Sequence, residues 1–245
     1  MADVTLLIFA KYPAAGQVMT RLCPPLTPDA AAAVQRSCIR LICERAFRDW
    51  PTRPVLCASP DDREMGFREI VGPFLPIVKQ GEGDLGQRLL RGARRVLNDD
   101  GQERVLMIGS DSPTIPAERF REAGARLGSS DAVIGPAHDG GFYLIGLRKT
   151  TPGMFDGVEW GTEHAAAQTI ERLRGAGMTV AELEPWYDID RPDDLHRALH
   201  DLRTAGRRDA YELQKVVEQA LAAAMPAVAA PGSEVKRGAR TRRRG

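Results

Sequence analysis

The stretch from Val105 to Pro113 constrains the fold of this chain more than any other, because four apolar residues lead directly into Gly-Ser-Asp-Ser-Pro. An apolar run bounded by turn residues is typical of a strand that is buried on both faces of a sheet. Gly109 permits close approach of the backbone, and Pro113 favours an extended Ser112. The pattern predicts a central strand of an α/β sheet, with Asp111 just past its carboxyl end.

The position of Asp111 indicates a metal site. Ligands of open α/β sheets bind at the carboxyl ends of the strands, and a carboxylate there suits a divalent cation on a phosphate ligand. The alternative is that Asp111 only caps a helix that starts near Pro116, since Asp, Ser and Pro all favour turns. This stretch alone leaves both interpretations open.

Short apolar runs alternate with amphipathic segments over most of the chain, which favours a mostly parallel central sheet flanked by helices. We therefore predict an α/β domain over residues 1–204, a C-terminal helix over 205–225, and an Ala/Pro-rich linker with a basic, disordered tail over 226–245. The expected strands cover residues 4–10, 54–58, 74–78, 105–108, 131–135 and 179–183, and the expected helices 28–50, 61–71, 85–97, 116–127 and 163–174.

The basic residues are concentrated near the C-terminus. Residues 232–245 carry a charge of +5, so the remainder carries −4 in a chain whose formal net charge is +1. A slightly acidic body is not typical of a nucleic-acid-binding domain, so no specific nucleic acid is expected. The tail is either a weak contact for an anionic partner such as RNA or acidic lipid, or a solubilising end, and its composition favours the second.

The sequence shows no pattern of a membrane span, of a targeting segment or of paired cysteines. No stretch approaches a membrane span, and the N-terminus has no basic region followed by an apolar run, so we expect a cytoplasmic protein. The four cysteines form no C-x-x-C pair and are predicted to be reduced, mostly buried thiols. They are Cys23, Cys38, Cys43 and Cys57.

The loop after the first strand contains Pro, Gly, Lys and Arg, which is where a mononucleotide fold holds phosphate. Its spacing is neither G-x-x-x-x-G-K-[ST] nor G-x-G-x-x-G. Lys11 and Arg21 would supply positive charge, and backbone N–H groups near Gly16 would form the cradle. The alternative is a plain basic loop.

The segment 79–89 places two glycines before an amphipathic helix, which would let the backbone approach a flat ligand such as a base. A simple strand-to-helix turn is the alternative. The candidate nucleotide-binding residues are Ala10, Lys11, Gly16, Thr20, Arg21, Gln80, Gly81, Gly86 and Ser110.

Three further aspartates are candidates for chemistry. Asp139 lies in an Asp-Gly-Gly turn between two apolar runs, which fits a hairpin turn but also places a carboxylate near the active edge of the sheet; we treat His138 as incidental. Asp188 and Asp190 flank Ile189 on an extended segment, so their side chains share one face. Two such carboxylates repel each other unless a positive charge lies between them, and a metal shared with Asp111 would supply it.

Five motifs in this order resemble a bacterial glycosyltransferase-like family, also called radical-SAM/selenodomain-associated or arsenosugar-biosynthesis transferases, over about Val4 to Leu199. The motifs are Phe9–Leu22 (FAKYPAAGQVMTRL), Gly109–Pro113 (GSDSP), Gly135–Leu144 (GPAHDGGFYL), Trp160–Thr162 (WGT) and Asp188–Leu195 (DIDRPDDL).

The resemblance implies a Rossmann-like GT-A fold of the nucleotide-diphospho-sugar transferase superfamily, which also holds nucleotidyltransferases such as phospholactate guanylyltransferases. It implies a nucleotide over the carboxyl edge of the sheet, usually with Mg²⁺ or Mn²⁺. Asp111 matches the superfamily's metal aspartate and Asp190 a late aspartate that completes the site. The chain departs from the family in having Met19 where lysine is usual, Arg191 where threonine is common, and Ser-Asp-Ser in place of a full Asp-x-Asp.

We expect transfer of a glycosyl group from a nucleotide-diphosphate sugar to a small acceptor. Mg²⁺ or Mn²⁺ on Asp111, Asp188 and Asp190 would offset charge on the departing diphosphate, together with Lys11 and Arg21. Asp139 is the candidate base. The same groups would serve nucleotidyl transfer from an NTP with release of pyrophosphate. A non-catalytic nucleotide-binding protein is a third hypothesis, which the Met19 departure supports, and the oligomeric state stays open.

Overall fold

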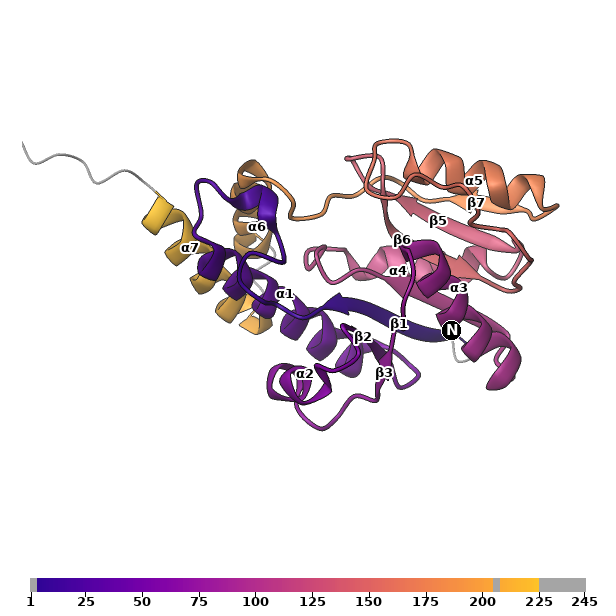
Figure 1. The fold of residues 1–245 in the computed structure, drawn as a ribbon, viewed down its shortest axis with the longest axis horizontal. Coiled ribbons are helices and arrows are strands. Elements are labelled where there is room, and N and C mark those ends of the chain that lie inside the picture. The colour runs from indigo at the N-terminus through magenta and orange to yellow at the C-terminus, as the bar shows by residue number, and fades with distance from the viewer. Residues whose placement is uncertain (1–3, 205–207, 225–245) are drawn as a thin grey trace, which may run out of the picture.

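The computed structural model describes residues 4–204 and 208–224 and contains a seven-stranded sheet in the order β3-β2-β1-β4-β6-β5-β7 (Figure 1). The predicted α/β fold with a mostly parallel central sheet is confirmed. The strands are β1 (Val4–Lys11), β2 (Val55–Ser59), β3 (Ile77–Lys79), β4 (Arg104–Ile108), β5 (Ala132–Pro136), β6 (Phe142–Leu147) and β7 (Val180–Glu182).

Strand β6 runs antiparallel to both of its neighbours, whereas all the other pairings are parallel. Leu144 of β6 pairs with Ile108 of β4 on one side and with Gly135 of β5 on the other. The Asp139 turn is therefore the hairpin turn that the sequence indicated. Because β6 is reversed, this turn lies at the edge where β1 and β4 end.

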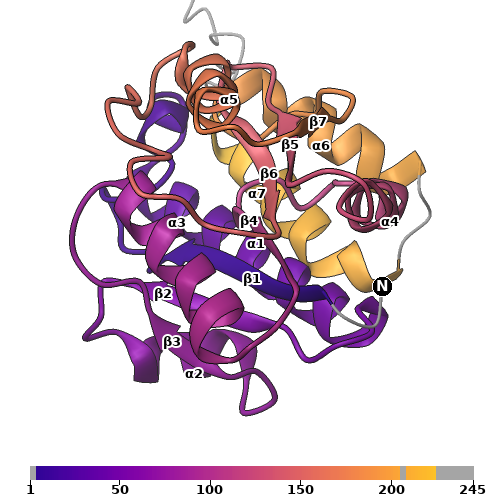
Figure 2. The same cartoon turned by 90° about the vertical axis from the view of Figure 1, so that its right-hand side faces the viewer.

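Helices cover both faces of the sheet (Figure 2). Helices α1 (Pro28–Asp49), α2 (Glu64–Val71) and α4 (Ala117–Arg126) share one buried cluster with one face of the sheet. Helices α3 (Leu85–Arg94) and α5 (Ala165–Gly175) share a second cluster with the other face. A third cluster joins α6 (Pro192–Thr204) and α7 (Tyr211–Ala224) to the outer side of α1. Two short 3₁₀ helices, η1 (Thr20–Leu22) and η3 (Arg208–Ala210), and one π-helical segment, η2 (Arg95–Asp99), are the remaining helical elements of the described residues.

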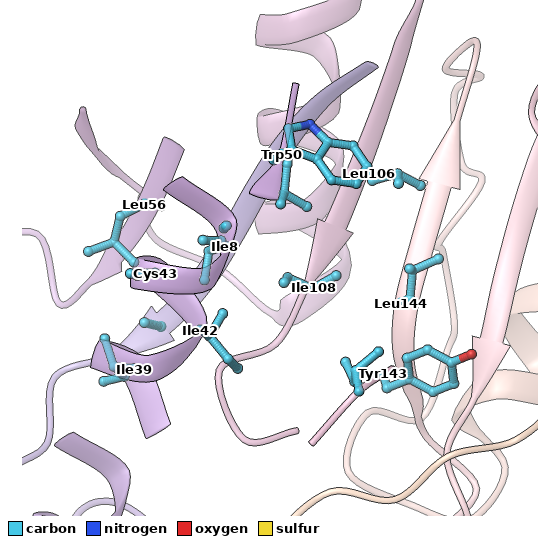
Figure 3. Packing of buried hydrophobic residues seen from close by; sticks show 14 of the residues in the cluster. Ile8, Ile39, Ile42, Cys43, Trp50, Leu56, Leu106, Ile108, Tyr143 and Leu144 are labelled. Carbon is cyan, nitrogen blue, oxygen red and sulfur yellow. The ribbon is translucent and has the colours of Figure 1, made fainter. Parts of the chain in front are cut away.

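Helix α1 organises the first face because apolar residues recur on two of its sides. Its start is the predicted one, since Thr27 Oγ1 accepts a hydrogen bond from Ala30 N at 3.2 Å and Pro28 occupies the first turn. On the inner side, Ile39 and Ile42 lie in the same cluster as Ile8 of β1 (Figure 3). This packing fixes α1 against the strands whose ends form the site.

Some predicted boundaries differ from the structure. Strand β3 begins at Ile77 rather than at residue 74, because Pro76 has no N–H for a strand ladder and the Phe74 carbonyl accepts from the Arg53 side chain at 2.6 Å. Helix α2 begins at Glu64 rather than at residue 61. The described part of the predicted C-terminal helix is α7, and the linker and basic tail over 226–245 lie outside the described residues. Within those residues no helix is both long and apolar enough to cross a bilayer.

Candidate functional site

Two adjoining cavities of about 280 and 260 Å³ open at the carboxyl edge of the sheet. Lys11, Gln35, Asp111 and Asp188 line both of them, so we describe them as one cleft with an apolar end and a carboxylate end. The apolar end reaches Leu85, Leu89 and Phe142, and the carboxylate end reaches Asp139 and Asp190.

All four predicted aspartates meet at the carboxylate end of this cleft, although three separate segments supply them. Backbone contacts hold the segments together, since Ile189 N donates to Asp111 O at 2.9 Å. The Ser112 hydroxyl donates to the Asp188 carboxylate. Asp139 Oδ1 accepts from Gly141 N at 2.9 Å, which fixes the direction of that side chain. The carboxylates are therefore positioned before any ligand binds.

The loop that carries Asp111 is also held from α1. The buried Arg45 guanidinium donates to Pro113 O at 2.6 Å and to Ile115 O at 2.7 Å. Gln35 Nε2 donates to Ser110 Oγ at 2.9 Å. Because these contacts are buried, they restrain the loop more firmly than exposed contacts would.

Burial raises the pKa of both Asp111 and Asp188, and neighbouring carboxylates raise both further. For Asp188, the largest contribution from a carboxylate comes from Asp111, whereas the Ser112 hydrogen bond acts in the opposite direction. Such mutual repulsion means that the cleft holds more negative charge than its own cations offset.

The donor set fits a divalent cation, because carboxylate oxygens are the ligands that Mg²⁺ and Mn²⁺ prefer. A cation between Asp111, Asp188 and Asp190 would relieve the repulsion that raises the pKa of Asp111 and of Asp188. Nevertheless, no three or more His, Cys, Asp or Glu side chains in the described part of the chain are placed so that they could together hold a metal ion. The metal assignment of these three residues therefore stays a prediction.

The two predicted phosphate-binding cations have different surroundings. Lys11 lines the cleft, and its Nζ donates to Gln17 O at 2.8 Å within the same loop. Arg21 is directed to Asp190, with 2.8 Å between Nη1 and Oδ2. Met19, between them, lines the cleft with a positive φ of 46°, a conformation that non-glycine residues adopt rarely and at a cost in energy. The loop is thus held in an uncommon conformation.

Gln80 closes the apolar end of the cleft. Its buried Nε2 donates to Cys57 O at 2.7 Å and to Ala10 O at 3.1 Å, and since only a donor can bind two carbonyls, the amide orientation is fixed. Ala10, Gln80 and Ser110 line the cleft as predicted nucleotide-binding residues.

The other predicted nucleotide-binding residues do not line it. Gly81 N donates to Asp61 Oδ1, and Gly86 packs against the Trp160 ring and Phe155 Cβ. Gly16 and Thr20 lie in the exposed loop after β1. Arg21 does not line the cleft either, and a nucleotide role stays a prediction for every one of the candidates, including those that line it.

Gln35 is a site residue that the sequence analysis missed. It lies on the buried side of α1 with 6% of its surface exposed, and it lines both parts of the cleft. The sequence did contain a signal for it, because Gln35 is a polar residue on the apolar face of an amphipathic helix. Ser59 and Arg88, which also line the cleft and are 3.3 Å apart between Oγ and Nη1, were missed as well.

A family model and a solved structure each match a large part of this chain. A family model described as "Uncharacterized protein conserved in bacteria (DUF2064)" matches residues 42–162. A crystal structure from Desulfovibrio desulfuricans G20, provisionally described as a nucleotide-diphospho-sugar transferase, is 32% identical, with a TM-score of 0.81 over 91% of this chain and 97% of that chain. Among curated proteins no match was found.

More distant structures share the fold alone. The CMP:2-keto-3-deoxy-manno-octonic acid synthetase complexed with CTP is 13% identical over 83% of this chain and 99% of that chain, with a TM-score of 0.53. The 4-diphosphocytidyl-2C-methyl-D-erythritol synthase from Anaerococcus prevotii DSM 20548 is 14% identical over 83% and 100%, also with a TM-score of 0.53. The shared architecture extends over nearly the whole of both structures.

Proposed function

The chain belongs to the nucleotide-diphospho-sugar transferase-like superfamily, and on this premise we propose that it is a metal-dependent transferase that moves a glycosyl group from a nucleotide-diphosphate sugar to a small acceptor. The observation that carries the proposal is the convergence of Asp111, Asp139, Asp188 and Asp190 on one cleft with Lys11. A fold does not fix a function, so the proposal rests on the chemistry of this cleft.

The cleft offers a place for each part of the donor. Its apolar end, closed by Gln80 and Ala10, takes the base, and its carboxylate end takes the diphosphate and the sugar. Lys11 contacts the diphosphate and offsets charge that develops as the sugar leaves. Mg²⁺ or Mn²⁺, held by Asp111, Asp188 and Asp190, would supply further positive charge at the leaving group.

The acceptor hydroxyl needs a base, and Asp139 takes that role. Its Oδ1 is occupied by the Gly141 N–H, which leaves Oδ2 to accept the proton. Arg21 is more than half exposed, so its guanidinium turns from Asp190 to the diphosphate at little cost.

Nucleotidyl transfer would use the same groups on an NTP, because that reaction also depends on positioning and charge neutralisation. The two reactions differ in their product. Glycosyl transfer releases a nucleoside diphosphate, whereas nucleotidyl transfer releases pyrophosphate.

Thermal unfolding with candidate donors tests the proposal. UDP, GDP, CDP and dTDP, their sugars, and the NTPs are each added with Mn²⁺ or with EDTA. Ligand at about a hundredfold over its Kd adds roughly 2.7 kcal/mol of stability. We expect a metal-dependent shift with one nucleotide-diphosphate sugar, lost in Asp111→Asn and retained in the exposed control Asp29→Asn. A shift with an NTP alone would replace glycosyl with nucleotidyl transfer, and no shift with any ligand would overturn both.

A further inference from the structure

We propose that the acceptor is an anion and that Arg197 and His138 bind its carboxylate or phosphate group beside Asp139. The inference rests on the proposed function, because it deepens the description of the second substrate. It starts from a cation on α6 that no part of the nucleotide site uses.

Arg197 is held in one place by two contacts. Its Cζ lies 3.9 Å from the centroid of the Tyr187 ring, which is a close cation–π contact. Its Nη1 lies 3.2 Å from His138 Nδ1. A planar guanidinium that is already stacked and hydrogen-bonded loses little freedom when it binds an oxyanion.

The charge of Arg197 is not neutralised by an ion pair within the described residues. Two nearby acids on the same helix are engaged elsewhere. Asp194 Oδ2 accepts from Asp190 N and Arg191 N, and Asp201 Oδ2 accepts from the Tyr187 hydroxyl at 2.7 Å. By contrast, Arg203 further along α6 pairs with Glu218 at 2.5 Å. Arg197 is therefore an ordered cation whose guanidinium is free for an external anion.

His138 supplies a second donor. Because a guanidinium only donates, the contact requires Nδ1 to accept, and the N–H of the ring is then on Nε2. The backbone of His138 is fixed by its N–H, which donates to Trp186 O at 2.9 Å. The imidazole thus presents an N–H next to the guanidinium.

The location of this pair connects it with the reaction. His138 directly precedes Asp139 in the hairpin turn, and the side chain of Asp139 lines the cleft. An acceptor whose hydroxyl reaches Asp139 would therefore place an anionic group at Arg197 and His138. Carboxylates and phosphates share the oxyanion chemistry that a guanidinium and an imidazole N–H recognise.

The test is an NMR titration of the nucleotide-free, full-length protein with inorganic phosphate and, separately, with acetate. The imidazole resonance of His138, assigned with His138→Asn, reports binding. We expect a saturable shift with a Kd on the order of millimolar, weakened roughly fivefold or more in Arg197→Met, whose stem still covers Tyr187. Arg191→Met removes a neighbouring exposed arginine and should leave the titration unchanged.

The possible outcomes distinguish a phosphorylated acceptor from a carboxylate acceptor, and they test the anion site separately from the proposed transferase function. A shift with phosphate assigns a phosphorylated acceptor, and a shift with acetate alone assigns a carboxylate acceptor. No saturable shift with either probe, or equal weakening in Arg191→Met and Arg197→Met, would overturn the anion site. If Arg197→Met fails to fold, Arg197→Lys, which keeps the charge without the planar stack, should still weaken the titration. The thermal unfolding assay with donors fails or succeeds independently, since this titration needs no nucleotide.

Discussion

Arg21 Nη1 lies 2.8 Å from Asp190 Oδ2, so a cation that the sequence assigned to phosphate neutralises one of the cleft carboxylates. The hydrogen bond to Asp190 and its charge raise the pKa of Arg21. The two residues are 169 positions apart, and the pair joins the loop after β1 to the segment before α6. The predicted contact with phosphate would therefore compete with the ion pair to Asp190 for the same guanidinium.

Arg21→Gln should weaken nucleoside diphosphate binding about tenfold, because a charge-assisted contact with the diphosphate is lost. Stability should fall by no more than about 1 kcal/mol, since the ion pair is largely exposed. Isothermal titration and urea unfolding measure the two effects. Arg40→Gln, which removes a similar exposed pair with Glu44, should leave the affinity intact. Equal affinity of Arg21→Gln and the wild type would contradict a phosphate role.

Asp188→Asn should stabilise the metal-free protein at pH 7. Burial and Asp111 raise the pKa of Asp188, and a carboxyl group with a raised folded-state pKa loses its contribution to stability as the pH rises through that value. In Asp188→Asn the side chain does not ionise, so it does not lose this contribution, and its oxygen still accepts a hydrogen bond from the Ser112 hydroxyl. Unfolding in EDTA should show the advantage shrinking as the pH falls toward the ordinary value of 3.8. With Mn²⁺ added, the wild type should gain stability and the variant should not.

Gly86→Ala should destabilise the fold by about 1–3 kcal/mol through overpacking. A Cβ at this position would lie 2.7 Å from Trp160 Cζ2 and 2.8 Å from Phe155 Cβ. The control is Gly175→Ala in α5, where a Cβ meets nothing within 4 Å and a gain of about 0.4–1 kcal/mol is expected. Urea unfolding measures the free energy of unfolding of both variants, and similar values would show that the Trp160 ring and Phe155 move aside at little cost.

Only Cys23 should react with a thiol reagent in the native protein at mildly alkaline pH. Burial raises the pKa of Cys43 and of Cys57 to about 12, and it raises the pKa of Cys38 as well. Cys23 is partly exposed. Mass spectrometry should find one label on the folded chain and four after denaturation. Rapid native labelling of Cys57 would mean that the sheet opens beside β2.

The fold was predictable because its signals are local. The apolar run before Gly109 identified the central strand, and Thr27 and Pro28 marked the start of α1. The direction of β6 was accessible through the Asp-Gly-Gly turn. Boundaries such as the start of β3 were wrong where a side chain from another segment, Arg53, occupied a backbone carbonyl.

The site was predictable only in part, because its residues interact across long distances in the sequence. Asp111 and Asp139 could be expected at one edge of the sheet because each follows the end of a strand, and Asp188 and Asp190 could be expected on one shared face because they alternate along an extended segment. Their surroundings could not: the Arg21–Asp190 pair and the Arg45 contacts with the loop after β4 depend on how helices pack. Gln35 was hidden in a helix whose other buried residues are mostly apolar.

The order of the cleft residues along the chain bears on how the protein is made. Lys11 and Gln35 are synthesised early, whereas Asp188 and Asp190 follow almost at the end of the domain. A nascent chain that has emerged only as far as β6 can pair β1, β2 and β4, yet it has half of the carboxylates. A ligand that needs all four aspartates therefore cannot stabilise a partial chain that ends before Asp190, and its binding would report synthesis beyond that residue.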